Sequence, residues 1–118
     1  MHRDYMLYIK EMISAIEKIE RYANSISFKE FLENELIQDG IIRNLEVLGE
    51  ASKNIPEYIK KKYPQIKWRK ISGLRDILIH AYFNVDLSMI WDIINNHLPA
   101  LKVELLKIMK NEGGQSKS

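Results

Sequence analysis

Arginine, histidine and tyrosine occur close together in one stretch of the chain, at Arg75, His80 and Tyr82. Arginine keeps its charge and grips phosphate with a planar fork of N–H donors, whereas histidine exchanges protons near neutral pH. Held in place, such residues can stabilise a phosphodiester under attack and move the proton that the attack releases. The residue types therefore favour phosphodiester chemistry. The ordinary alternative is a salt-bridge donor and a cation at a helix end.

The spacing between Arg75 and His80 does not suit a single site on one straight helix. Five residues at about 100° each place the two side chains about 140° apart around the helix axis. Either the helix ends near His80 and the chain turns, or a second copy of the protein completes the site. The second option predicts a homodimer with a composite cleft.

The composition restricts the class of protein. With 118 residues the chain fits one domain with a single core. It has no cysteine, which excludes disulfides, thiolate catalysis and cysteine-bound metals. His2, His80 and His97 lack ligand spacing, so we expect no metal site and no cofactor, and any phosphodiester chemistry should be metal-independent. The chain begins without a signal-peptide pattern and has no membrane-length apolar run, so we expect a cytoplasmic protein.

A basic patch precedes Arg75. The net charge of +2 is too small to indicate nucleic-acid binding by itself, but the patch holds no acidic residue. Its members are Lys60, Lys61, Lys62, Lys67, Arg69 and Lys70. Such a patch can follow an RNA backbone, with bases stacked on the rings of Tyr63 and Trp68. Trp68 and Trp91 are, however, expected to anchor the core or a dimer interface instead of binding bases. We expect Lys67, Arg69 and Lys70 to contact RNA, and an ordinary solvated loop is the alternative.

The elements that must position these residues are helices, because the hydrophobic period is three to four residues almost throughout. The helix that carries Arg75 should start near Trp68, with an apolar stripe and a polar row in which Gly73 leaves open space. Two of the other expected helices are long, at about residues 3–23 and about 37–54, and a break in the second is possible near Gly40. A short helix should begin at a capping box formed by Ser27 and Glu30, and residues 57–62 should form at most another short helix. A last helix should begin after Asp86, which caps it.

The last helix has a heptad seam that is typical of a bundle core, and Pro99 should kink it. The seam residues are Leu87, Trp91, Ile94, Leu98, Leu101, Leu105 and Ile108. The predicted fold class is all-α, a single-domain up-and-down bundle of about five helices. The bundle should span residues 1–110, and a flexible tail should follow at 111–118.

Several landmarks resemble the HEPN superfamily, specifically the HepT-like ribonuclease toxins that pair with a minimal nucleotidyltransferase antitoxin. The matching segments are residues 42–51, Tyr63-Pro64 with 66–69, 73–82, and Val85-Asp86 leading to Trp91. The match covers most of the chain. Its specificity comes from several unrelated motifs in the same order.

The resemblance implies a homodimeric, metal-independent endoribonuclease of a type VII-like toxin–antitoxin system, with Arg75 and His80 of both subunits in one cleft. His80 would act as base toward the ribose 2′-hydroxyl or as acid toward the leaving 5′-oxygen, and Arg75 would stabilise the phosphate. Asp76 is placed to orient His80, and an exposed helical ion pair is its alternative. For Arg75 the alternative to phosphate contact is an ion pair with Asp76 or Glu50. Tyr82 matches the position to which the antitoxin transfers AMP, which would oppose RNA binding. The RNA, such as tRNA or mRNA, is not specified.

Two further points stay open at the level of sequence. Gly49 and Ala51 should permit close helix approach, while Arg43 and Glu50 either form an ion pair or line the cleft. A non-catalytic helical module is the alternative function, one that binds a nucleotide or presents a substrate to the nucleotidyltransferase. The presence of both Arg75 and His80 favours the enzyme, because an adaptor would not need both.

Overall fold

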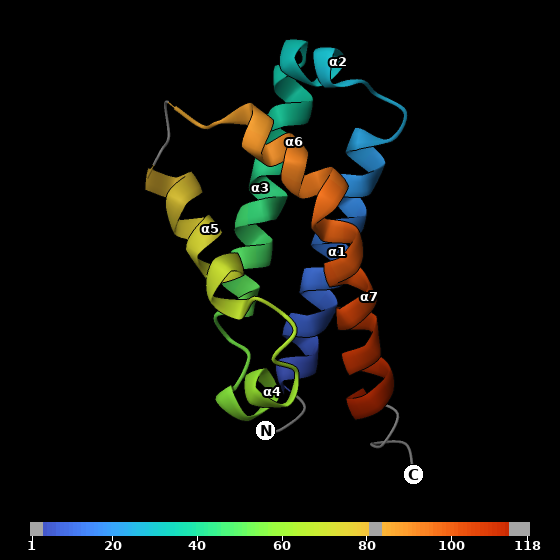
Figure 1. Ribbon diagram of the computed structural model, residues 1–118, viewed down its shortest axis with the longest axis vertical. Coiled ribbons are helices and arrows are strands. Elements are labelled where there is room, and N and C mark those ends of the chain that lie inside the picture. The colour runs from blue at the N-terminus through green and yellow to red at the C-terminus, as the bar shows by residue number, and fades with distance from the viewer. Residues whose placement is uncertain (1–3, 81–83, 114–118) are drawn as a thin grey trace.

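The computed structural model describes residues 4–80 and 84–113 of the protein, and within these ranges it contains helices and no strand. The helices are α1 (Asp4–Ala23), α2 (Phe28–Glu33), α3 (Glu35–Ser52), α4 (Glu57–Lys62), α5 (Trp68–His80), α6 (Leu87–Asn96), α7 (Leu98–Ile108) and the short π-helix η1 (Met109–Gly113). The long helices run alternately up and down (Figure 1). The predicted all-α bundle is confirmed.

The core forms where the apolar stripes of the long helices meet. Along α1, residues at steps of three and four are fully buried, as are the matching positions of α3 and the end of α7. The fully buried residues of these three helices include Ile9, Met12, Ile16, Ile19, Ile41, Leu45, Leu48, Leu105 and Ile108. The predicted heptad seam is part of this core, with Leu98 buried and Leu101 packed against it.

The helix starts follow the expected capping chemistry. The Ser27 hydroxyl oxygen accepts from the Glu30 backbone N–H at 3.1 Å, and the Glu30 carboxylate accepts from the Ser27 backbone N–H at 2.7 Å. Asp86 caps α6 by accepting from the backbone N–H groups of Ser88 and Met89. Both predicted caps are confirmed, and they fix the points at which α2 and α6 begin.

The expected last helix is divided into α6 and α7, and the division lies at His97. Pro99 has no N–H to donate to the carbonyl four residues earlier, and it suits the first turn of a new helix. This division and the formation of α4 raise the number of α-helices from about five to seven in the described chain. No break occurs near Gly40, where α3 packs against the Tyr22 ring.

The described end of the bundle includes the first residues of the stretch that was expected to be a tail from residue 111. Helical structure continues to Gly113 in η1, and Glu112 ties this end to α4. The Glu112 carboxylate accepts from the Tyr63 hydroxyl at 2.6 Å and lies 2.8 Å from the Lys62 ammonium group. Residues 114–118 lie outside the described residues.

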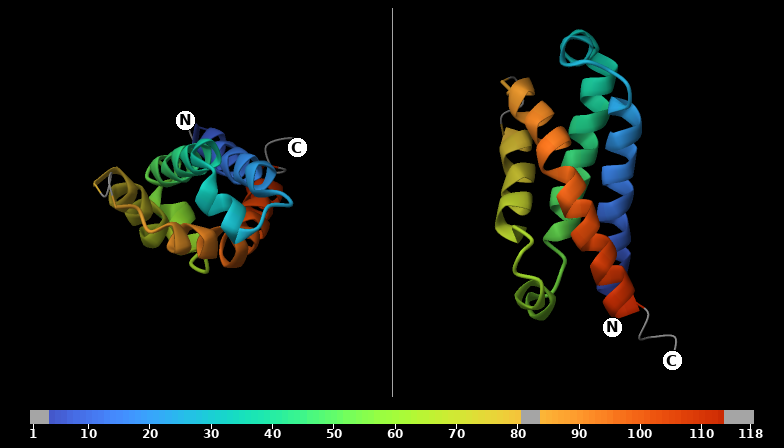
Figure 2. Two further views of the ribbon diagram at one scale, coloured as in Figure 1. Left: turned by 90° about the horizontal axis from the view of Figure 1, so that it is seen from above. Right: turned by 45° about the vertical axis from the view of Figure 1, so that its right-hand side comes forward.

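Helix α5 lies at one edge of the bundle beside α3, and its other side faces away from the remaining helices (Figures 1 and 2). Gly49 permits this contact, because a Cβ atom there would lie 2.4 Å from Arg75 Cβ and 2.9 Å from the Ile71 carbonyl oxygen. The close approach predicted for Gly49 is confirmed. The edge position of α5 leaves its polar row accessible.

Candidate functional site

Helix α5 is held at its start and in its middle, while its end is exposed. Trp68 is buried, and its indole N–H donates to the Tyr63 carbonyl at 3.0 Å. Leu78 is also buried, whereas His80 is exposed at the last position of the helix. The start near Trp68 confirms the predicted boundary. The packed first part of α5 therefore holds the helix in place, while its last residue, His80, is exposed to solvent.

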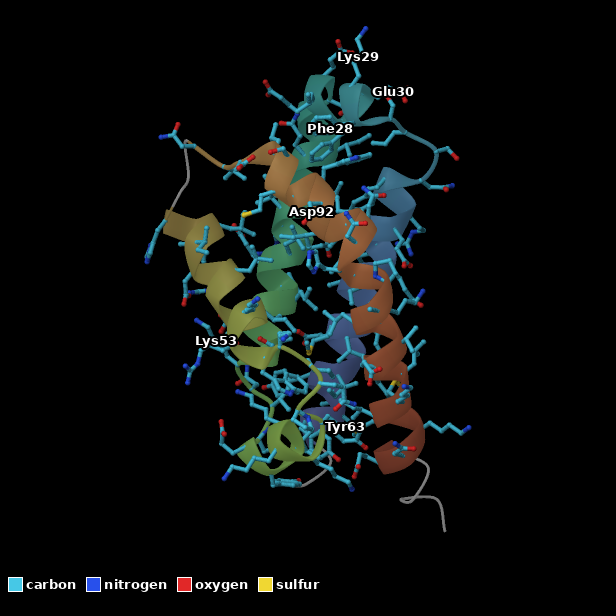
Figure 3. The ribbon with its side chains drawn as sticks, in the orientation of Figure 1. Phe28, Lys29, Glu30, Lys53, Tyr63 and Asp92 are labelled. Carbon is cyan, nitrogen blue, oxygen red and sulfur yellow. The ribbon has the colours of Figure 1, made fainter. Side chains whose placement is uncertain are left out.

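Arg75 lies in an ion-pair network between α3 and α5. Its Nε atom is 3.0 Å from Glu50 Oε1, and its Nη1 donates to Asp76 Oδ1 at 3.1 Å. The same Asp76 oxygen accepts at 2.9 Å from the ammonium group of Lys53, which is labelled beside α5 in Figure 3. The two carboxylates, Glu50 and Asp76, thus balance the charges of the two cations, Arg75 and Lys53.

The network also sets the protonation of Asp76. Hydrogen bonds from Lys53 and then from Arg75 hold the pKa of the Asp76 carboxyl below its usual value. Among the described residues Asp76 hydrogen-bonds with these two cations and not with His80. The role of Asp76 in orienting His80 stays a prediction.

Arg75 and His80 leave α5 in different directions. Because α5 is a continuous helix from Trp68 to His80, the two side chains lie about 140° apart around its axis. Arg75 Cβ faces Gly49 of α3, while His80 is exposed. Tyr82 lies outside the described residues. One copy of α5 therefore supplies the two groups from different sides.

The basic patch is divided by its contacts. Lys60 pairs with Glu57 at 3.8 Å and Lys62 with Glu112, whereas the other four cations are exposed and have no ion pair within the described residues. Those four are Lys61, Lys67, Arg69 and Lys70. The three predicted RNA contacts are thus accessible at and just before the start of α5.

The rings of Tyr63 and Trp68 are not accessible for stacking with bases, and Trp68 takes the core position that the sequence favoured for it. Both rings are buried, with 6% and 7% exposure. Trp68 donates to the Tyr63 backbone, and the Tyr63 hydroxyl is bound to Glu112. These contacts use the polar atoms of both rings inside the bundle. The two residues anchor the loop before α5 instead.

Sequence reasoning missed two contacts that hold α3 against α5. Lys53 was not among the candidates, although it pairs with Asp76. Ser52 is fully buried and its hydroxyl lies 2.8 Å from that of Ser72. The available signal was a serine on the apolar face of α3, in line with Leu45 and Leu48. The contact between Ser52 and Ser72 is thus a hydrogen bond at a position where apolar side chains would otherwise pack between α3 and α5.

Arg43 takes no part in this network. It lines a cavity of about 260 Å³ between α1 and α3, together with Lys18, Tyr22 and Asn44. Glu50 pairs with Arg75 and not with Arg43 in the described chain. None of the predicted site residues lines this cavity.

The described residues hold neither a group of metal ligands nor a helix that could cross a membrane. No three histidine, aspartate or glutamate side chains in residues 4–80 and 84–113 gather as metal ligands would. Within the same ranges, every helix is too short or too polar to traverse a bilayer.

Residues 12–108 match the family described as "Ribonuclease HepT-like". The protein named "Probable ribonuclease HepT" from Thermococcus cleftensis is 42% identical over 110 residues, which cover 93% of this chain and 100% of that protein. A candidate RNase of Methanocaldococcus jannaschii is 37% identical over 116 residues, covering 98% of this chain and 96% of the relative.

Another M. jannaschii relative is named as a gamma-glutamylcyclotransferase and candidate RNase, and it is 39% identical over 110 residues. These cover 93% of this chain but 50% of that protein, so the chain spans half its length. No solved structure matches the chain. The family match spans most of the helical bundle and includes the whole of α5, and on this evidence the chain belongs to the HepT-like ribonuclease family.

Proposed function

We propose that the protein is a metal-independent endoribonuclease toxin that uses Arg75 and His80 in a cleft between two copies of α5. The observation that carries the proposal is the position of both residues on an edge helix, in a chain of the HepT-like ribonuclease family. His80 is exposed to solvent, and Arg75 keeps a third of its side chain exposed despite its ion pairs.

The reaction is transesterification of an RNA phosphodiester. His80 of one subunit takes the proton of the ribose 2′-hydroxyl, whose oxygen forms a bond to phosphorus while the bond from phosphorus to the 5′-oxygen breaks. His80 of the other subunit returns a proton to the leaving 5′-oxygen. Arg75 stabilises the negative charge that builds up on the phosphate. The products are a 2′,3′-cyclic phosphate and a 5′-hydroxyl.

A second copy would dock on the open side of α5. Ile77 is apolar yet 54% exposed, and one turn earlier on the same face of α5 a Cβ atom at Gly73 would meet no neighbour within 4 Å. Apolar side chains beside a glycine allow two helices to approach closely and bury surface that is exposed in one copy. The dimer would bring two copies of the motif together.

RNA would reach the cleft along the exposed cations Lys67, Arg69 and Lys70, which attract the phosphate backbone. The proposal also includes a cytoplasmic nucleotidyltransferase antitoxin that transfers AMP to Tyr82. The added phosphate would repel RNA at the end of α5. The substrate would be tRNA or mRNA.

The test is cleavage of total tRNA and mRNA in EDTA by the purified protein, by His80→Ala and by His97→Ala. His97 is a matched control, because it is also an exposed histidine but lies between α6 and α7. We expect the wild type and His97→Ala to cleave and His80→Ala to be inactive. Equal cleavage by all three proteins would contradict the role of His80. If mass spectrometry shows that Tyr82 is unmodified and the wild type still cleaves no RNA, the result would favour a nucleotide-binding module.

A further inference from the structure

We propose that Glu50 on α3 is the positioning residue for Arg75. It would hold the Nε side of the guanidinium group so that the Nη2 edge is turned toward the RNA phosphate. This inference rests on the proposed function and adds a residue that neither the motif on α5 nor the family match assigns. The support lies in the contacts between α3 and α5.

The two helices are fixed against each other directly beside Glu50. Gly49 is the point of closest approach, because a Cβ atom there would overlap Arg75 Cβ. One turn away, the hydroxyl groups of Ser52 and Ser72 meet at 2.8 Å, and Ser52 is fully buried. Since packed cores deform little, these contacts fix the position of Glu50 along α3 relative to Arg75 on α5.

Within the described chain, Glu50 is the one residue of a second helix that contacts the guanidinium group of Arg75. Asp76 is the neighbour of Arg75 on α5, so it moves with the helix that carries Arg75. Glu50 lies on α3, with its Oε1 atom 3.0 Å from Arg75 Nε. A carboxylate on a separate, packed helix can define the direction of the guanidinium plane, which a neighbour on the same helix cannot do alone.

The arrangement leaves donors for a substrate. A guanidinium group has five N–H donors in a rigid fork. Nη1 donates to Asp76 and Nε faces Glu50, while Nη2 has no partner among the described residues. Its two N–H groups match the oxygens of a phosphate. Arg75 can therefore be held by protein and bind phosphate at the same time.

The charges predict a specific kinetic signature. Glu50 and Asp76 balance Arg75 and Lys53, so an arriving phosphate adds an uncompensated negative charge. Glu50 thus orients Arg75 for the reaction and weakens the attraction for the substrate. Removing only its charge should tighten RNA binding and slow the chemical step. A merely structural contact would not move KM and kcat in this combination.

The experiment compares Glu50→Gln with Glu46→Gln in the full-length protein. Glu46 lies one turn earlier on α3 and has no ion pair within the described residues, so its variant has the same charge change without the contact. The measurements are kcat and KM on a short RNA, affinity for its 2′-deoxy analogue by fluorescence anisotropy, and the Arg75 Nε–H resonance by ¹⁵N NMR.

We expect Glu50→Gln to lower KM and to lower kcat on the order of 10²-fold, the cost of a misplaced catalytic group. Glu46→Gln should leave kcat unchanged. The Arg75 Nε–H resonance should shift in Glu50→Gln alone. Equal kinetic constants in the two variants would overturn the inference. If the wild type cleaves no RNA, the proposed function fails by itself. An Nε–H resonance that is the same in wild type and Glu50→Gln would then overturn the positioning role.

Discussion

Arg75 illustrates what single residues can and cannot reveal. Its type and its place before His80 were enough to predict a phosphate anchor. Asp76 and Glu50 were expected as its partners only as the alternative to phosphate contact, because Glu50 lies 25 positions earlier and folding brings the two together. Lys53 gave no sequence signal, since lysines on helix surfaces are common. The candidate residues were thus readable from sequence, but the network that orients them was not.

Arg75→Lys tests whether the planar fork matters beyond the charge. Lysine keeps the positive charge but cannot contact Glu50, Asp76 and a phosphate together. We expect RNA affinity to change only a few-fold and kcat to fall roughly 10²–10³-fold, the cost of losing one oriented electrostatic donor. Steady-state kinetics on a defined RNA measures both.

Arg21→Lys on α1 serves as the control, because Arg21 is exposed and far from α5 in the chain. It should leave both constants unchanged. A rate for Arg75→Lys within a few-fold of wild type would show that a point charge is sufficient.

At the level of elements, hydrophobic period and capping chemistry predicted most of the helices. Ser27 and Asp86 signal their caps locally, so their positions could be read from a few residues. The division at His97 and the end of η1 could not be read in this way. The first depends on how Pro99 is accommodated in the bundle, and the second depends on Glu112 reaching Tyr63, 49 positions away.

The contact between α3 and α5 depends on Gly49. In Gly49→Ala the new Cβ atom would meet Arg75 Cβ at 2.4 Å and a backbone oxygen at 2.9 Å, so the helices must separate. We expect a loss of about 1–3 kcal/mol in the free energy of unfolding. Urea denaturation followed by circular dichroism measures it.

Gly73→Ala is the matched control on α5, and both variants are compared in a chain that also carries Ile77→Arg, so that the proposed dimer contact at Gly73 does not contribute. No atom lies within 4 Å of the new Cβ, so the change should stabilise the helix by up to about 1 kcal/mol in a single copy. Destabilisation of both variants to the same degree would contradict the proposed packing. Cleavage by Gly49→Ala should also fall, because Glu50 and Arg75 would separate.

The end of the bundle should respond to acid through Glu112. Hydrogen bonds from Lys62 and then from Tyr63 hold the pKa of its carboxyl below the usual value. The stabilisation is therefore present above the unfolded pKa of about 4.3 and is lost as pH falls through the folded value. We expect the urea midpoint of wild type to fall between pH of about 6 and about 3 by more than that of Glu112→Gln.

Glu33→Gln provides the comparison for this pH series, since Glu33 is exposed and has no ion pair among the described residues. Its midpoint should follow the wild-type pH dependence. If the urea midpoints of wild type and Glu112→Gln fell equally with pH, Glu112 would not contribute to the acid sensitivity.

For the whole molecule, the open side of α5 determines whether the site is complete. The predicted angle between Arg75 and His80 left a second copy as one of two options, and the exposed Ile77 provides a surface for it. The sequence predicted the polar row of α5. It could not reveal that Ile77 is exposed, because the exposure of this side chain depends on how α5 packs on α3.

Ile77→Arg should convert the protein to monomers, because a charge would replace the most exposed apolar side chain of the proposed interface. Light scattering coupled to size exclusion gives the mass, and RNA cleavage should be lost with the dimer. Leu36→Arg is the control, since Leu36 is 82% exposed at the start of α3. It should stay dimeric and active. A monomeric wild type that cleaves RNA would contradict the composite cleft.

The most direct test of the account is the chemistry of the cleaved ends. A short RNA and the same RNA with one 2′-deoxy nucleotide at the cleaved position are incubated with wild type in EDTA, and the products are identified by mass spectrometry. The account predicts a 2′,3′-cyclic phosphate and a 5′-hydroxyl from the RNA and no cleavage at the substituted position. Cleavage of the 2′-deoxy position, or a 5′-phosphate product, would contradict the proposed attack by the 2′-hydroxyl.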